Sequence, residues 1–312
     1  MSNHRREQSE GDAAPQRFTK GHGTRNDFVL IPDPEGRLAL DADAVAAISD
    51  RRGGIGADGV IRIVRTAVSG VEVPGTDGAE SPGAEGVEGA DPEGAAQPEW
   101  LMDYRNADGS IAEMCGNGVR VFAACLDRAG LAGSGDFVIA TRAGARRVEI
   151  LERPAAAGDA WQVRVGMGPG RLTEPERTVT ITGRTLPAWD VDMGNPHAVA
   201  LLPDDLELED LDLTVQPALD PMPEGGANIE LVARRGERHV AMRVFERGVG
   251  ETQSCGTGAA AVGLAAAHWA GDDSGQEWRV DVPGGSLVIG FRESEMTLAG
   301  PAVIVADGSL AI

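Results

Sequence analysis

Two short runs of the sequence share one pattern. Residues 114–118 (Met-Cys-Gly-Asn-Gly) and 254–258 (Ser-Cys-Gly-Thr-Gly) each place a cysteine before Gly-x-Gly, and a stretch that can form a helix follows each run. The glycines let the backbone turn tightly and approach a ligand closely. A helix that begins there points its free N–H groups and the positive end of its dipole outward. The chain therefore contains the same cysteine–glycine motif twice, which indicates that one structural unit has been duplicated.

The cysteines of these runs, Cys115 and Cys255, are the candidate catalytic groups. The pKa of free cysteine is ~8.5 and a helix N-terminus lowers it, so we expect both thiols to be unusually acidic. If the two sulfurs face one carbon atom from opposite sides, one can remove a proton while the other returns a proton to the opposite face. That chemistry inverts the carbon without a cofactor. The third cysteine, Cys125, lies in an apolar helical stretch and is predicted to belong to the core.

Composition and charge limit the classes of partner. The 312 residues carry a formal net charge of −21. Nucleic acids and anionic membranes need a positive surface, so neither is expected as a partner. Three cysteines do not form a secreted disulfide framework, and residues 1–16 lack the apolar core of a signal peptide, so we expect a cytoplasmic protein. The small-apolar run 256–271 is interrupted by Gly258, Gly263 and His268, which predicts a buried helix rather than a membrane span.

Apolar runs and glycine-rich turns alternate along the chain. This pattern predicts an α/β (α+β) fold of two similar domains, each a curved, mostly antiparallel or mixed sheet wrapped around a central helix. Helices are expected over residues 43–51, from the first cysteine run to about 129, and over 258–269. Strands are expected at residues 28–31, 60–64, 100–104, 137–140, 147–151, 161–165, 240–245, 278–282, 286–289 and 296–299.

The same reading gives domain boundaries. We expect an N-terminal domain at residues 17–159 and a C-terminal domain at 160–300, after a disordered leader at 1–16. Residues 70–99 are rich in Gly, Pro, Ala, Asp and Glu and hold no basic residue. That composition is typical of a disordered acidic insertion, and no chemistry is assigned to it.

A set of ordered motifs gives the chain a family resemblance. They are His22-Gly23, Asn26-Asp27-Phe28, residues 54–58 (Gly-Ile-Gly-Ala-Asp), residues 106–110 (Asn-Ala-Asp-Gly-Ser), the two cysteine runs with Arg120, residues 193–197 (Met-Gly-Asn-Pro-His), Asn228, residues 246–252 (Glu-Arg-Gly-Val-Gly-Glu-Thr) and residues 283–285 (Pro-Gly-Gly). On these motifs the sequence resembles the diaminopimelate epimerase family, from about Phe18 to Ile312.

The resemblance carries expectations about fold and activity. It implies two pseudo-symmetric domains, with a last strand at residues 301–312 that returns to the N-terminal domain. It implies interconversion of LL-2,6-diaminopimelate and meso-diaminopimelate, in lysine and peptidoglycan biosynthesis, without a cofactor or a metal ion. The implied partners are a small-molecule substrate and a second copy of the chain, as a homodimer. Ala306 departs from the pattern, because some relatives have a dimer-supporting tyrosine there.

The resemblance also assigns roles to residues. Glu246 is expected to hold the α-ammonium and to assist proton abstraction, and His197 to tune the thiols. The backbone N–H groups of Gly116, Asn117, Gly256 and Thr257 at the two expected helix N-termini can bind the α-carboxylate. Further substrate contacts are expected from Asn26, Asn106, Asn195, Asn228 and Arg247. Gly59 stands where some members have a substrate-contacting glutamine, so no contact is carried over to it.

Three other interpretations stay open. A proline or hydroxyproline racemase-type protein would share the two-thiol fold, although those proteins tend to have His where this chain has Asn117. A non-catalytic thiol switch would use Cys115 and Cys255 as a reversible disulfide. An acidic binding module would depend on residues 70–99, and deleting them would then abolish function. Serine in place of either cysteine separates an epimerase from a switch.

Overall fold

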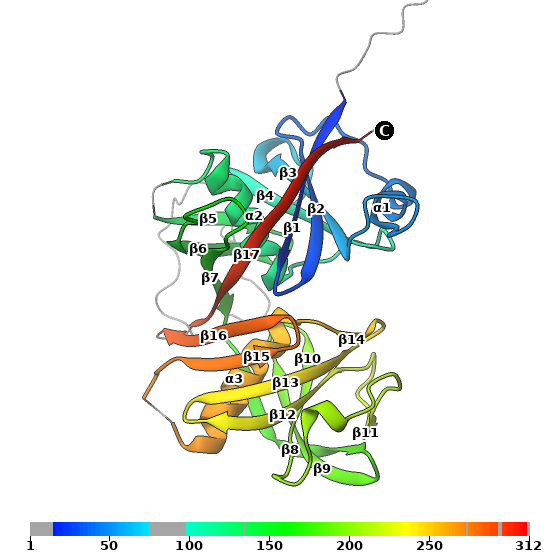
Figure 1. The fold of residues 1–312 in the computed structure, drawn as a ribbon, viewed down its shortest axis with the longest axis vertical. Helices are drawn as coiled ribbons and strands as arrows, with labels where there is room; N and C mark the ends of the chain where they lie inside the picture. Colours follow the sequence, from blue (N-terminus) through cyan, green and yellow to red (C-terminus); the bar gives the residue numbers. More distant parts are fainter. Residues whose placement is uncertain (1–14, 75–97, 134, 273, 293–294, 311–312) are drawn as a thin grey trace, which may run out of the picture.

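The computed structural model describes residues 15–74, 98–133, 135–272, 274–292 and 295–310. Figure 1 shows two lobes, one around helix α2 and the other around helix α3, with the long strand β17 running from the junction of the lobes across the lobe around α2. Each lobe is a curved sheet around one buried helix, as the sequence predicted. The predicted leader at 1–16 lies almost wholly outside the described residues, as does most of the predicted insertion at 70–99.

The N-terminal lobe is a ring of strands. Its elements are β1 (Gln16–Gly23), β2 (Asn26–Pro32), α1 (Ala42–Ser49), β3 (Gly59–Arg65), η1 (Thr66–Val68), β4 (Trp100–Asn106), α2 (Gly116–Arg128), β5 (Asp136–Thr141), β6 (Gly144–Glu152) and β7 (Trp161–Gly168). Each strand pairs with the next, β7 pairs with β17, and β17 pairs with β1, which closes the ring around α2.

The C-terminal lobe repeats this plan. Its elements are β8 (Arg171–Ile181), β9 (Arg184–Asp192), β10 (Pro196–Leu201), η2 (Leu208–Asp210), β11 (Ala218–Asp220), β12 (Asn228–Gly236), β13 (His239–Glu246), β14 (Gly250–Thr252), α3 (Gly256–Ala270), β15 (Trp278–Val282), β16 (Gly285–Arg292) and β17 (Glu295–Leu310). The parallel pairs β10–β12 and β13–β15 occupy the places that β2–β3 and β4–β5 hold in the first lobe. The two lobes are therefore pseudo-symmetric.

Two boundaries differ from the sequence prediction. β7 pairs along β6, so the first lobe extends to Gly168 rather than ending at 159; the polar residues before β7 form a hairpin loop, not a linker between domains. The strands expected at 296–299 and 301–312 are one continuous strand, β17. Its first half pairs with β16 and its second half with β1.

The start of the predicted acidic insertion is also part of the fold. Val73 is buried and packs with Val64 and Leu101 in a small apolar cluster. The expectation of disorder from residue 70 onward is therefore wrong for residues 71–74. Val71 and Val73 supply apolar side chains at this point, although the segment as a whole is acidic.

Burial explains why α2 and α3 sit at the centres of the lobes. Residues 116–126 of α2 are all buried, and α3 buries its small residues, including Gly263. A Cβ at Gly263 would lie 2.8 Å from Ile289 of β16, so the helix and the sheet meet at a distance that only glycine permits. One hydrophobic core contains Phe122 of α2 and Val262 of α3, which joins the lobes. Within the described residues no helix has both the length and the apolar character needed to span a bilayer.

Candidate active site

The N-termini of α2 and α3 face each other across the junction of the lobes. Cys115 is the N-cap of α2 and Cys255 is the N-cap of α3, both in extended backbone conformation. A Cβ built on Gly256 would lie 3.3 Å from the Cα of Gly116 and 3.5 Å from the backbone N of Asn117. The two helix ends therefore approach to backbone contact, and the amides predicted to bind a carboxylate converge on one place.

Cys115 is half-buried in the first lobe. Its Sγ donates a weak hydrogen bond to Asn26 Oδ1 at 3.6 Å. Burial raises the pKa of Cys115 to about 11, and the negative charge of Glu246 adds to this rise. The backbone N–H groups of Gly118 and Asn117 and the charge of Arg120 lower the pKa in part. The prediction of an unusually acidic thiol is thus wrong here, because desolvation outweighs the helix N-terminus.

Cys255 is more deeply buried in the second lobe. Its Sγ accepts a hydrogen bond from the backbone N–H of Gly258 at 3.4 Å and lies 3.6 Å from the hydroxyl of Thr257. Burial raises the pKa of Cys255 well above its ordinary value, and the charges of Glu246 and Glu230 raise it further. The expected acidity is wrong for this thiol as well. The charge of Glu246 thus acts on both thiols, while Arg120 acts on Cys115 and Glu230 on Cys255.

His197 forms a buried pair with a carboxylate. Its Nδ1 lies 2.6 Å from Glu230 Oε1, and both side chains are 0% exposed. The other ring nitrogen, Nε2, lies 3.1 Å from Asn195 Oδ1, and Asn195 Nδ2 is 3.5 Å from Thr257 Oγ1. A series of polar contacts therefore leads from Glu230 through His197 and Asn195 to Thr257, whose hydroxyl lies close to the sulfur of Cys255.

Sequence reasoning missed Glu230. The residue lies in the middle of β12, whose first six residues are all buried. A carboxylate in such an apolar run needs a partner, and that pattern was the signal available in the sequence. His197 on β10 is adjacent because β10 and β12 pair in parallel, with His197 opposite Asn228.

Glu246 is the last residue of β13 and sits beside both thiols. Its carboxylate accepts a hydrogen bond from the hydroxyl of Thr252 on β14, the strand that pairs back onto β13. Burial raises the pKa of Glu246, and the hydrogen bond from Thr252 opposes that rise. The β13–β14 hairpin thus holds a carboxylate in a poorly solvated position.

The asparagines divide into two groups. Asn26 is held by Asp58, whose Oδ2 accepts from Asn26 Nδ2 at 2.8 Å, and its Oδ1 accepts from Asn117 Nδ2 at 3.2 Å. With Asn195, these residues are in contact with the cysteine-bearing helix ends. In contrast, the Asn106 side chain donates to Ser110 Oγ at 3.0 Å within its own turn, which is the ordinary role of a turn asparagine.

Asn228 and Arg247 are joined by a hydrogen bond. The backbone N–H of Arg247 donates to Asn228 Oδ1 at 2.9 Å, and Arg247 Nη1 donates to the carbonyl of Gly225 at 3.1 Å.

The structure also accounts for Gly59, since a Cβ there would lie 2.5 Å from the Arg105 carbonyl oxygen and from the Tyr104 ring. No side chain fits at position 59 without a shift, which explains why no glutamine stands there.

Comparison with known proteins identifies the family. The family model of diaminopimelate epimerase matches residues 18–173 and 190–308. The chain belongs to the diaminopimelate epimerase family. The diaminopimelate epimerase of Streptomyces coelicolor is 48% identical over 297 residues, covering 93% of this chain and 94% of that protein. That of Rhodococcus opacus is 45% identical over 303 residues, covering 94% of this chain and 96% of that protein. The predicted membership of this enzyme family is confirmed.

Solved structures support the fold. A PhzF-family phenazine biosynthesis protein from Bacillus anthracis has a TM-score of 0.66 at 14% identity, covering 96% of this chain and 100% of that one. A probable proline racemase from Agrobacterium radiobacter has a TM-score of 0.60 at 14% identity, covering 95% of this chain and 93% of that one. At such identities the likeness concerns the fold alone, so this family member shares its two-lobed architecture with more distant proteins.

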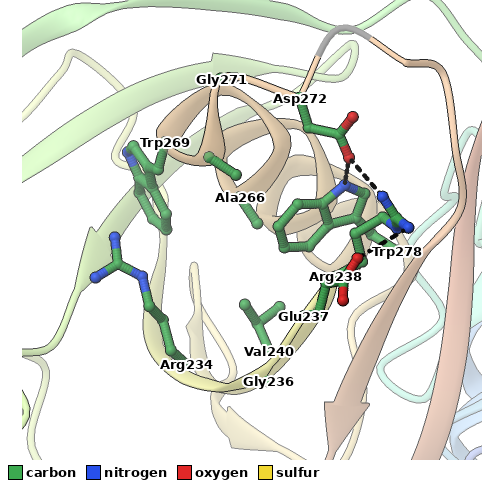
Figure 2. A pocket seen from close by; sticks show the side chains of 11 residues that line it. Arg234, Gly236, Glu237, Arg238, Val240, Ala266, Trp269, Gly271, Asp272 and Trp278 are labelled. Carbon is green, nitrogen blue, oxygen red and sulfur yellow. Dashed lines mark hydrogen bonds and ion pairs between the residues drawn. The ribbon is translucent and has the colours of Figure 1, made fainter.

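A separate hollow of about 390 Å³ lies at the other end of α3. Figure 2 shows Trp269 and Trp278 in its wall, with Arg238 next to Glu237 and Asp272. Arg238 forms ion pairs with both carboxylates, and Trp278 Nε1 donates to Asp272 at 3.2 Å. The residues that line this hollow include none of the predicted site residues. Among the described residues no group of three or more His, Cys, Asp or Glu side chains is placed to hold a metal ion.

Proposed function

We propose that this protein interconverts LL- and meso-diaminopimelate by proton transfer between Cys115, Cys255 and the substrate α-carbon. Membership of the family supports the reaction. The observation that carries the mechanism is the contact between the N-termini of α2 and α3, each capped by one of the two thiols.

The substrate α-carboxylate binds where the two helix ends meet. The amides of Gly116 and Asn117 on one side and of Gly256 and Thr257 on the other lie in the first turns of α2 and α3, where N–H groups have no partner within the helix and can turn to an anion. The carboxylate gains negative charge as the α-proton leaves, so fixed N–H groups stabilise the transition state more than the ground state. Anion binding and catalysis therefore use the same backbone groups.

Proton transfer then follows from the position of the thiols. One sulfur, as thiolate, takes the α-proton, while the other, as thiol, gives its proton to the opposite face of the carbon. The first sulfur ends as thiol and the second as thiolate, which is the state needed for the reverse reaction. Burial makes each thiolate a stronger base than a solvated one, which suits a weakly acidic C–H bond. Glu246 binds the α-ammonium, and His197 with Glu230 supports the Cys255 side.

The distal end of the substrate carries a second amino group and carboxylate. We assign its recognition to Asn195, Asn228 and Arg247, with Asn26 and Asn106 as further contacts. Arg247 can bind a carboxylate through its guanidinium fork, and asparagines can both donate and accept. This recognition distinguishes the proposed substrate from a monocarboxylate amino acid such as proline.

The proposal extends to the setting of the reaction. It includes lysine and peptidoglycan biosynthesis, a cytoplasmic location and a homodimer. All three cysteines are free thiols in the structure, which suits a reducing compartment. Val305 of β17 is 61% exposed and gives that strand an apolar surface residue that a second copy can cover. Sedimentation velocity measures whether the protein is a dimer.

The decisive test uses reduced protein and LL-diaminopimelate in deuterated water. Chiral separation should show meso product with deuterium at the α-carbon, because the returned proton comes from a different group than the one that received the first. Product that keeps all of its original α-hydrogen would rule out two bases. Proline serves as the negative control substrate and should not be racemised.

Cysteine variants test the mechanism directly. Cys115→Ser and Cys255→Ser should each reduce turnover by about 10³-fold under full reduction. Cys125→Ala is the matched control, because Cys125 is buried in the core at 5% exposure and should keep near-normal activity. If the serine variants lose only a response to oxidation, the protein is a thiol switch and not an epimerase.

A further inference from the structure

Arg120 is a buried cation without a charged partner. It lies on α2, five residues after Cys115, and is 0% exposed. In the part of the chain that the structure describes, no carboxylate lies within ion-pair distance of its guanidinium. Burial lowers the pKa of Arg120 to about 10, so the group stays charged near neutral pH. A buried charge normally requires a counter-ion, and this one is left uncompensated.

Neutral oxygens accept the hydrogen bonds of this guanidinium. Nη2 donates to Asn117 Oδ1 at 2.8 Å and to Thr24 Oγ1 at 3.1 Å. Nη1 donates to the carbonyl of Gly116 and Nε to the carbonyl of Pro301, both at 3.3 Å. These contacts fix the orientation of the group but leave its positive charge free to act on an anion nearby.

The contacts of Arg120 also connect the two lobes. Thr24, which accepts from Arg120, donates to Ser254 Oγ at 2.7 Å. Asn117, which also accepts from Arg120, donates to the carbonyl of Ser254 at 3.0 Å. Ser254 directly precedes Cys255, and Pro301 lies in β17, the strand that both lobes share. The guanidinium therefore holds the first turn of α2 against the residue that leads into α3.

The charged and titratable groups around Cys115 come from three elements. Glu246 of β13 disfavours the thiolate and Arg120 of α2 favours it. Tyr104 of β4 is near enough for the charge of Cys115 to raise its pKa, and it is neutral in the working range. Arg120 is thus the cation that offsets Glu246 at this thiol.

We propose that Arg120 is a positioning residue for the reaction: its fork aligns the two helix N-termini, and its charge stabilises the thiolate of Cys115. The proposal rests on the proposed function for its catalytic meaning. Its electrostatic part concerns the thiol alone and is measurable without substrate, so its failure is distinguishable from failure of the proposed function.

The experiment measures alkylation of Cys115 by iodoacetamide as a function of pH. A Cys125→Ala, Cys255→Ser background leaves Cys115 as the sole thiol. In that background Arg120→Gln removes the charge but keeps N–H donors, and Arg120→Lys keeps the charge. We expect Arg120→Gln to raise the pH midpoint by about one unit, which lowers the rate about tenfold on the acid side. Arg120→Lys should keep the midpoint within 0.3 units, as an approximate bound.

Controls separate charge from structure. Ser254→Ala removes the hydroxyl that accepts from Thr24, keeps the carbonyl that accepts from Asn117 and changes no charge, so it should leave the midpoint in place. A folded Arg120→Gln variant with an unchanged midpoint would overturn the proposal. If Arg120→Gln does not fold, Arg120→Met takes its place: a midpoint raised by about one unit supports the proposal, and an unchanged midpoint overturns it. With the cysteines intact, Arg120→Lys should lower kcat about tenfold and change KM little, since alignment acts on the transition state.

Discussion

The two cysteine-bearing helix ends have the same backbone and different surroundings. In both, an extended cysteine caps a helix that starts with Gly-x-Gly. Cys115 is half-buried, with Asn26 as its hydrogen-bond partner and with the charge of Arg120 partly offsetting that of Glu246, whereas Cys255 is buried and the charges of Glu246 and Glu230 both act on it. The repeat of the sequence thus fixes geometry in both lobes, while the protonation preferences of the thiols come from residues outside the repeat.

This difference teaches how a pseudo-symmetric site can serve two protonation states. A two-base reaction needs one thiolate and one thiol at the start of each turnover. Glu246 and Glu230 both favour the neutral form of Cys255, whereas at Cys115 the charge of Arg120 partly offsets that of Glu246.

The largest contrast is expected between matched glycines. Gly256→Ala places a methyl group 3.3 Å from the Cα of Gly116, so the facing helix end must shift, and we expect turnover to fall about 10²-fold. In Gly116→Ala the new methyl group meets the flexible side chain of Met167 at 3.5 Å, and turnover should change only a few-fold. Gly133→Ala, with open space around it, is the control. Equal effects at 116 and 256 would show that the contact between the ends is not tight.

The second contrast concerns the reactivity of the thiols. In Cys125→Ala protein, iodoacetamide at pH 8 should modify Cys115 about ten times faster than Cys255, because Cys255 is buried at 8% exposure between negative charges. Peptide mass spectrometry after timed quenching gives both rates in one sample. Faster modification of Cys255 would reverse the comparison.

A smaller change is expected when one of those charges is removed. Glu230→Gln keeps the shape of the side chain and an oxygen that can pair with His197. Removing the negative charge lowers the pKa of Cys255, so its alkylation rate at pH 8 should rise roughly threefold. The rate at Cys115, whose close carboxylate is Glu246, serves as the internal reference. A fall in the Cys255 rate would contradict the assigned direction.

The smallest effect is on stability. Burial raises the pKa of Glu246, so the folded state binds more protons than the unfolded state above the ordinary value of 4.5, and stability falls as pH rises through that window. Glu246→Gln should therefore raise the Tm at pH 7.5 by about 2 °C, although activity is lost. At pH 4 the two proteins should melt together. A lower Tm for the variant at pH 7.5 would show that the charged carboxylate is stabilising.

The sequence was sufficient for elements that an apolar pattern or a special residue marks. The glycine and cysteine runs predicted the starts of α2 and α3. β2 contains a continuous run of buried apolar residues, and β3 has buried apolar residues on both sides of Arg62. The sequence did not predict β1, because its buried positions are Thr19, Gly21 and Gly23 and the strand therefore shows no apolar alternation. Its pairing depends on a strand from the far end of the chain.

The motifs placed Asn195, His197 and Glu246 in the candidate site, because each stands in a short recognisable run, and their roles stay predictions. The structure brings Asn195 into contact with His197 and with Thr257 of α3. The rise in the thiol pKa values was not predictable, since it depends on how deeply a folded lobe buries each sulfur. Glu230 was missed for a related reason: its partner His197 lies 33 residues away and is adjacent only after β10 and β12 pair.

The shared strand β17 has a consequence for biosynthesis. The second half of β17 pairs with β1, so Gln16 lies opposite Leu310. During translation the first lobe emerges with an incomplete ring, because the strand that closes it follows the second lobe in the sequence. Such long-range pairing slows folding and leaves a sheet edge open until β17 has been made. A nascent first lobe therefore completes its ring only after the whole second lobe has been synthesised.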